Sequence, residues 1–429
     1  MNSIMFLQII KKNKANIIFI GIILSITYLL YYYRNVGIHD VGAYLHSGEV
    51  LIDRKNPYEL GLSKWGTVGP IILYLFSKII PNSLSGTIFQ LINLFGVFLF
   101  FRIFSNSKKS INTQLIFLLV LWISPVREML AVNQITGIIL GCLSLGQYFI
   151  LASKDNNKFV YKFLISPMCF AIAIDLKPHI TIYIFIILII ATRNFKLLFN
   201  TALIFVFMHL IIDFYVGIFL ERDWVHAVLK VGSSASDNKL RDSVSFWPLL
   251  NHYINFPKAF YLVSFILIIA LLLYAIYLGY KMKTDAALYI GLIIPSLSIY
   301  YHYYDSIPLC ILALNWAITE RKYIYSALLL SFFLIPKEYL SLRNTFLVLL
   351  FEIVLMIIFT NMGYIADIFL VRNLIYGIGF TYLIHLINTL LNLNPFILQS
   401  IVVSETLFLT YYLLFQNGKN AKIFNPILF

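Results

Sequence analysis

Apolar runs separated by short basic segments limit this chain to very few folds. A helix that crosses about 30 Å of hydrocarbon needs roughly 20 apolar residues, and its backbone groups must bond within the helix. Charged residues make up only 12% of the sequence, against about 25% in soluble domains. The sequence therefore predicts an all-α polytopic integral membrane protein with about 12–14 transmembrane helices. The apolar segments fall at about 16–33, 85–104, 114–126, 134–152, 163–175, 179–192, 198–219, 259–279, 286–300, 306–318, 323–336, 345–361, 364–391 and 397–415.

Lysines precede the first apolar run, 16–33, as they would in a secretory signal peptide. The run is longer than a typical signal-peptide core and lacks a small-residue cleavage site, so we expect it to be the first membrane helix. Its basic flank places the N-terminus in the cytoplasm. No internal repeat divides the chain, and we expect residues 1–429 to form one transmembrane domain. The sequence indicates no oligomeric state.

The shorter apolar stretch 68–80 contains Gly69-Pro70 and stops at Pro81. It is too short for a full crossing, so we expect an interfacial or re-entrant segment. With this stretch left out, the basic clusters fall on one side of the membrane, as the positive-inside rule requires. The net charge of +13 then reflects topology and not nucleic-acid binding. These clusters are Lys11/Lys12/Lys14, Arg102/Lys108/Lys109, Lys154/Lys158/Lys162, Arg193/Lys196, Lys281/Lys283, Arg321/Lys322 and Lys419/Lys422.

Two long loops, 34–66 and 221–258, fall on the opposite, non-cytoplasmic side. Since functional residues concentrate on loops, we expect the chemistry at the outer face of the cytoplasmic (inner or plasma) membrane. Asp40 follows the first helix in the first of these loops. The residues after it, 41–52, have the mixed pattern of a helix that lies along the membrane. Asp40 is a candidate reactive carboxylate and a candidate N-cap of that helix, and the two roles can coexist.

Polar residues also mark the outer ends of later apolar runs. Asn133 and Gln134 begin one run, where amides can bind a polar ligand or bridge neighbouring helices. Lys177 precedes Pro178 at a break, and charge kept at such a depth is commonly functional. The alternative for Lys177 is a surface pair with Asp175.

The second long loop carries Trp224, Arg241 and Trp247 as possible ligand contacts, although most of it is expected to be solvated. Beyond it, His302 and Asp305 stand among four tyrosines at another outer helix end. His302 could bind a phosphate or a sugar hydroxyl, or the tyrosines could form an aromatic belt at the interface.

The sequence predicts neither a metal site nor a cofactor. The only other acids of the first loop, Glu49, Asp53 and Glu59, are expected to be mostly solvated. The three cysteines lie far apart in apolar segments without CxxC spacing, which is typical of packing residues. They are Cys142, Cys169 and Cys310.

Several motifs together resemble those of glycosyltransferase family 87, enzymes of the GT-C class that use polyprenyl-phosphate sugars. The first is DVGAYLHSGEVLIDRKNPYE, from Asp40, followed by VNQITGIILG, LKP, a Ser-rich stretch before Phe246, and YHYY at His302. They occur in the family's order over roughly residues 35 to 315. The chain has Val68-Gly69-Pro70 where the family commonly has Tyr-Pro-Pro, and Asn133-Gln134 where it has Gly-Gln.

The resemblance implies a GT-C-like bundle whose donor is a lipid-phosphate sugar, often of mannose, and whose acceptor is a glycolipid or lipid-linked glycan. Asp40 would act as general base, with inversion at the anomeric carbon. Lys177 and His302 would bind the donor phosphate. The expected substrate contacts are Tyr44, Tyr58, Asn133, Gln134, Arg241 and Asp305.

Three other kinds of membrane protein are the alternatives. A polysaccharide polymerase would carry paired arginines in a large outer loop, whereas this second loop has only Arg222 and Arg241. A lipid-linked sugar flippase would line a central cavity with charge, and an ion-coupled transporter would show inverted repeats. Here the polar residues gather at one face.

Overall fold

The computed structural model describes the N-terminal two thirds of the chain with gaps. The predicted segments from 323 onward, together with Arg241 and Trp247, lie outside the described residues. The described residues are 14–37, 39–59, 66–104, 114, 117–118, 120–121, 123–152, 160–192, 194–220, 223–224, 226, 257–280, 291, 294–297, 302–308 and 310–311.

Within these ranges the chain is helical and contains no β-strand. The α-helices are α2 (Lys14–Tyr32), α3 (His39–Ile52), α4 (Val68–Ile79), α5 (Asn82–Phe104), α7 (Ser124–Ala131), α8 (Thr136–Ala152), α9 (Ser166–Leu176), α10 (Pro178–Thr192), α11 (Phe195–Val216) and α14 (Pro257–Tyr280). Short helices of other types are η1 (Arg34–Val36), η2 (Tyr161–Ile165), η3 (Ile294–Leu297) and η4 (Tyr303–Ser306).

Three helical stretches are long and apolar enough to cross a membrane: Ile18–Val36, Asn82–Ile103 and Phe195–Val216. A fourth candidate is a broken span, in which Pro125–Ala131 and Thr136–Ile150 meet at 117°. Large apolar side chains on these helices, such as Leu24, Phe95 and Phe214, point away from the protein. Over the described residues, the structure confirms a helical membrane protein.

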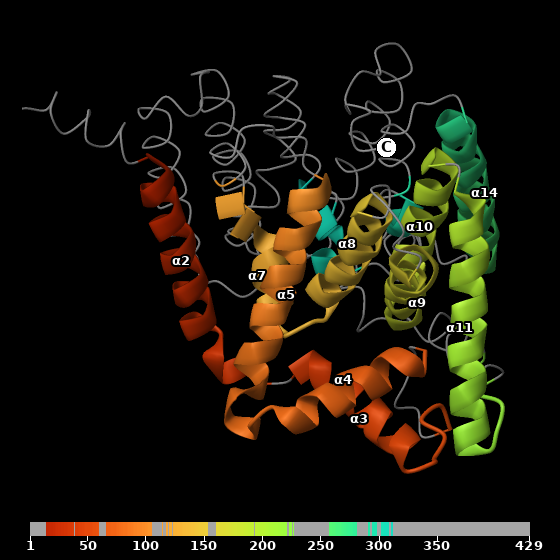
Figure 1. Cartoon of the computed structure of the whole chain (residues 1–429), viewed down its shortest axis with the longest axis horizontal. Coiled ribbons are helices and arrows are strands. Elements are labelled where there is room, and N and C mark those ends of the chain that lie inside the picture. The colour runs from red at the N-terminus through yellow and green to blue at the C-terminus, as the bar shows by residue number, and fades with distance from the viewer. Residues whose placement is uncertain are drawn as a thin grey trace, which may run out of the picture.

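Helices α3 and α4 lie across the lower ends of α2, α5 and α11 (Figure 1). Helix α4 has only 12 residues, or about 18 Å of length, so it is too short to cross a bilayer. This agrees with the prediction that the stretch 68–80 does not span. The two helices pack closely because Gly48 of α3 has no side chain where the carbonyl of Pro70 approaches it.

The outer surface of α4 is apolar with one cation. Lys78 is exposed, and its ammonium lies 4.6 Å from the centre of the Tyr74 ring. A hydrogen bond with the Tyr74 hydroxyl raises the pKa of Lys78, so this cation stays charged at neutral pH. An apolar face with a lysine is typical of a helix at the boundary between lipid tails and headgroups. The exposed apolar side chains are Ile72, Leu75, Phe76 and Ile79.

Among the described helices, α5 and α8 pack most closely. Gly96 of α5 faces the backbone of Gly137, and Gly141 lies one turn further along α8. Asn93 fixes the crossing, because its side-chain oxygen accepts the backbone N–H of Ile138 at 3.0 Å. Small residues that let backbones approach are the usual packing device of membrane helices.

Candidate active site

The predicted polar residues lie at helix starts and breaks that the fold brings together. Gln134 stands between α7 and α8, and Lys177 stands between α9 and α10. Pro178 disfavours helical geometry at Lys177, which adopts φ −149° and ψ 79°. Asn133 has a φ of +49°, a left-handed conformation that Asn tolerates better than most residues.

Lys177 is paired with Asp305 inside the protein. The Lys177 Nζ lies 2.7 Å from Asp305 Oδ1, and the two side chains are 3% and 0% exposed. Lys177 Nζ also donates to the Thr136 hydroxyl at 3.2 Å, and that hydroxyl donates to Asp305 Oδ1 at 3.0 Å. The ammonium faces the Tyr304 ring, 4.7 Å from its centre. Three side chains from two segments, α8 and η4, therefore surround one buried cation.

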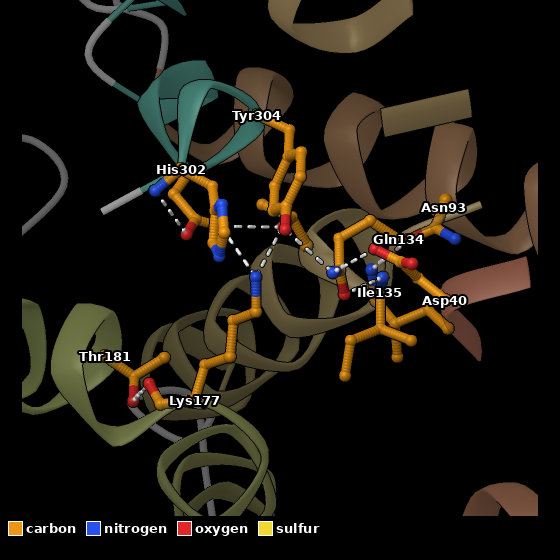
Figure 2. Close-up of polar contacts among 11 residues, drawn as sticks. Asp40, Asn93, Gln134, Ile135, Lys177, Thr181, His302 and Tyr304 are labelled. Carbon is orange, nitrogen blue, oxygen red and sulfur yellow. Dashed lines mark hydrogen bonds and ion pairs between the residues drawn. The ribbon is translucent and has the colours of Figure 1, made fainter. Parts of the chain in front are cut away.

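Gln134 links this cluster to Asp40. Its Nε2 donates to Asp40 Oδ2 and to the Tyr304 hydroxyl, both at 3.0 Å. Its Oε1 accepts the backbone N–H of Ile135, which fixes the orientation of the amide. Figure 2 shows the amide between Asp40 and Tyr304, with Lys177 directed toward η4. One continuous polar network thus runs from Asp40 to Lys177.

Asp40 is the second residue of α3 and is therefore not the N-cap considered above. It is partly exposed, and a carboxylate in the first helical turn is stabilised by the helix dipole. Its backbone N–H donates to the carbonyl of Val132 at 3.0 Å. The start of α3 is therefore fastened to the same break that holds Gln134.

Asn133 is fully buried. Its Nδ2 donates to the carbonyls of Gly37 and Gly86, at 2.6 and 3.2 Å. These bonds join the chain before α3 to α5 and to the break at Asn133. The predicted contact of Asn133 with substrate stays a prediction.

His302 lies at the partly exposed side of the cluster. Its ring stacks on Tyr304 with 5.0 Å between centres, and its backbone N–H donates to Asp305 Oδ2 at 3.3 Å. Phosphate binding by Lys177 and His302 stays a prediction, as does a substrate contact of Asp305, whose carboxylate here balances Lys177.

Two predicted substrate contacts lie outside this network. Tyr44 is fully buried in α3. Tyr58 packs with Leu51 and Leu220, next to Trp224, where the segment after α3 meets the end of α11. Their contacts with substrate also stay predictions.

The surface pair considered for Lys177 and Asp175 is wrong. Asp175 is buried, and its Oδ1 lies 2.8 Å from His209 Nε2. The two acids near Lys177 thus have different partners. Because Lys177 extends toward η4 and Asp175 toward α11, residues two apart along the chain serve separate contacts.

Glycosyltransferase family 87 matches residues 68–297, more than half of the 429-residue chain. The chain belongs to this family. No curated protein and no solved structure matches it. Membership in family 87 makes the chain an enzyme that transfers sugars, so the flippase and transporter interpretations find no support. The matched residues include Gln134, Thr136 and Lys177, whereas Asp40 and η4 lie outside them.

Sequence reasoning missed several side chains of this family 87 enzyme. Thr136 could have been found from its place two residues after Gln134. His209 lies in a long apolar helix, where an ionisable residue is itself a signal. Among the described residues, no group of three or more His, Cys, Asp or Glu could hold a metal ion.

Proposed function

We propose that this family 87 enzyme transfers a hexose, with mannose expected, from a polyprenyl-phosphate sugar to a glycolipid or lipid-linked glycan. The reaction takes place at the non-cytoplasmic face of the cytoplasmic membrane and inverts the anomeric carbon. The observation that carries this proposal is the network from the partly exposed Asp40 to the buried Lys177 through Gln134 and Tyr304. It puts a carboxylate and a cation at two ends of one cluster.

Asp40 is the general base of the proposed reaction. Gln134 holds one carboxylate oxygen, which orients the group for proton transfer. As the acceptor hydroxyl attacks C1 of the sugar, its proton passes to Asp40. The new C1–O bond forms opposite the departing phosphate, whose bond to C1 breaks. A single displacement of this kind inverts the configuration.

The leaving polyprenyl phosphate takes the electrons of the broken bond and needs positive charge or hydrogen-bond donors nearby. Asp305 offsets part of the cost of burying the Lys177 ammonium, because a paired ammonium is less costly in a low dielectric than an unpaired one. Lys177, with the hydroxyls of Thr136 and Tyr304, could then meet phosphate oxygens. His302, at the partly exposed side, is the proposed contact for the outer part of the donor.

The membrane setting supports a lipid-linked donor. The proposed topology puts the start of α3, and Asp40 with it, on the side away from the basic clusters. Nucleotide sugars are not supplied to the outer face, whereas a polyprenyl chain can carry a sugar there. Donor and acceptor lipids are therefore the expected partners, with no part for nucleic acid.

The test uses purified full-length protein in lipid nanodiscs with labelled polyprenyl-phosphate hexoses and a membrane glycolipid extract. The matched control is the nucleotide sugar of each hexose. We expect transfer from polyprenyl-phosphate mannose, no transfer from its nucleotide sugar, and a product of opposite anomeric configuration. Transfer from the nucleotide sugar alone, or retention of configuration, would contradict the proposal.

A further inference from the structure

A second buried polar cluster, separate from the active-site network, surrounds Asp175 of α9. The Asp175 carboxylate accepts the backbone N–H of Gly69 at 2.6 Å and that of Thr67 at 3.1 Å. Its Oδ1 also lies 2.8 Å from His209 Nε2 of α11. The carboxylate thus occupies the N-terminus of α4, where free backbone N–H groups favour a negative charge.

The side chains of this cluster also lie close to one another. The Thr67 hydroxyl lies 3.4 Å from His209 Nδ1, so His209 contacts Thr67 with one ring nitrogen and Asp175 with the other. The order hydroxyl, imidazole, carboxylate is also that of an activated nucleophile. However, all three side chains are buried. Burial suits a structural contact between helices better than nucleophilic attack on a substrate.

Two glycines let the start of α4 come this close to α9. A Cβ at Gly66 would overlap the Asp175 carboxylate, and a Cβ at Gly69 would overlap the side chain of Leu176. The backbone N–H of Gly66 also donates to the carbonyl of Asp175 at 2.9 Å. The segment 66–69 therefore packs closely against α9 and also donates backbone hydrogen bonds to the Asp175 carboxylate.

The cluster is connected to both ends of the active-site network. Asp175 precedes Lys177 by two residues, with the buried Leu176 between them. On the other side, α4 packs against α3 at Gly48 and Pro70, and α3 begins at the turn that carries Asp40. A shift of α4 would therefore move Asp40 relative to Lys177.

We propose that Asp175, His209 and Thr67 form a clamp that fixes the α3–α4 pair against α9 and α11 and so positions Asp40 relative to Lys177. These three are positioning residues and do not touch substrate. The inference rests on the proposed function for its catalytic consequence, whereas the clamp itself is a statement about structure.

The activity test compares four single variants and one double variant of the full-length enzyme in nanodiscs. Asp175→Asn replaces one carboxylate oxygen by an NH2 group, which cannot accept a backbone N–H from the start of α4. His209→Leu removes the ring nitrogens. His209→Gln keeps an N–H at a similar reach, and His46→Leu changes an exposed histidine of α3 as the matched control. Each rate is divided by the amount of folded enzyme. Size-exclusion recovery and thermal unfolding measure that amount.

We expect Asp175→Asn and His209→Leu each to lower kcat roughly 10- to 100-fold, since small misplacements of reacting groups cost that much. The KM for the donor should change little, because Lys177 keeps its own partners. His209→Gln should restore most of the activity, and the double variant Asp175→Asn/His209→Leu should be no worse than Asp175→Asn. A kcat per folded enzyme equal to wild type in Asp175→Asn would overturn the proposal.

A second measurement does not depend on activity. Spin labels at Ile79→Cys of α4 and Phe214→Cys of α11, positions 81% and 91% exposed, report the distance between these helices after Cys142, Cys169 and Cys310 are replaced by serine. We expect one narrow distribution that broadens with Asp175→Asn and stays narrow with His209→Gln. An unchanged distribution with Asp175→Asn would refute the clamp. If wild type transfers no hexose, the proposed function fails and these distances still decide the clamp.

Discussion

At Lys177 a charged side chain lies inside an apolar bundle. Moving an ammonium out of water costs several kcal/mol, and a partner at short range with further hydrogen bonds is needed to offset it. Asp305, Thr136 and the Tyr304 ring supply these contacts. The pair also holds η4 to the break between α9 and α10. The same ion pair therefore stabilises the fold and forms part of the active-site network.

Replacing one member of this pair should be worse than replacing both. Lys177→Met leaves the Asp305 carboxylate buried without its cation and should lower the free energy of unfolding by about 3–5 kcal/mol. The double variant Lys177→Met/Asp305→Leu should regain most of that loss and remain inactive. Denaturant unfolding in detergent micelles measures the first quantity and sugar transfer the second. Equal stability losses in the single and double variants would show that the pair is not coupled.

At the residue scale, the sequence indicated which polar residues come together better than it indicated their partners. Gln134, Lys177 and Asp305 were singled out because polar residues stood at helix ends, and they do lie in one network. The pairing considered for Asp175 and Lys177 was wrong, because the direction of a side chain at a helix break depends on tertiary packing. His209 was missed inside an apolar run.

At the element scale, apolar length predicted most of the described helices to within a few residues, as α5 and α14 show. The region 114–134 was harder. Its polar sequence SPVREMLA forms the separate helix α7, which turns sharply into α8. Pro125 at the helix start and the charges of Arg127 and Glu128 account for this short element, whereas hydropathy alone indicated one span ending at 126.

The close crossing of α5 and α8 makes a prediction of its own. Gly96→Ala places a methyl group on the carbonyl of Gly137, and the backbones must separate. Gly141→Ala, the matched control on the facing helix, puts its Cβ 3.1 Å from Gly96 Cα and needs a smaller shift. We expect Gly96→Ala to lower the unfolding free energy by about 1–3 kcal/mol and Gly141→Ala by less. A larger loss in Gly141→Ala would contradict the packing described for this crossing.

At the scale of the whole molecule, whether α4 crosses the membrane decides the side on which each later helix ends in the proposed topology. Cysteines at Asp53 and Asn82, which are exposed before and after α4, should react with a membrane-impermeant maleimide from the same side. Lys196→Cys, at the start of α11, lies on the opposite side in the proposed topology. It should react with the maleimide only after the membrane is permeabilised. Labelling of positions 53 and 82 from opposite sides would make α4 a transmembrane helix and reverse the proposed topology.

The whole fold was less accessible from the sequence than its elements. Lys/Arg distribution assigns helix ends to a side of the membrane, but it carries no information about which helices touch. The crossing of α3 and α4 below the bundle depends on Gly48 and on the clamp at Asp175. These close approaches join segments that lie far apart in the sequence. The sequence pattern alone therefore does not predict them.

The most direct test of the account is the rate of hexose transfer by Asp40→Asn, compared with Glu49→Gln as a second carboxylate change on α3. Asparagine keeps an oxygen that can accept the Gln134 amide, so the network should survive while the base is lost. We predict that Asp40→Asn lowers kcat at least about 100-fold with unchanged thermal unfolding, and that Glu49→Gln retains activity. Equal rates for Asp40→Asn and wild type would show that Asp40 is not the base.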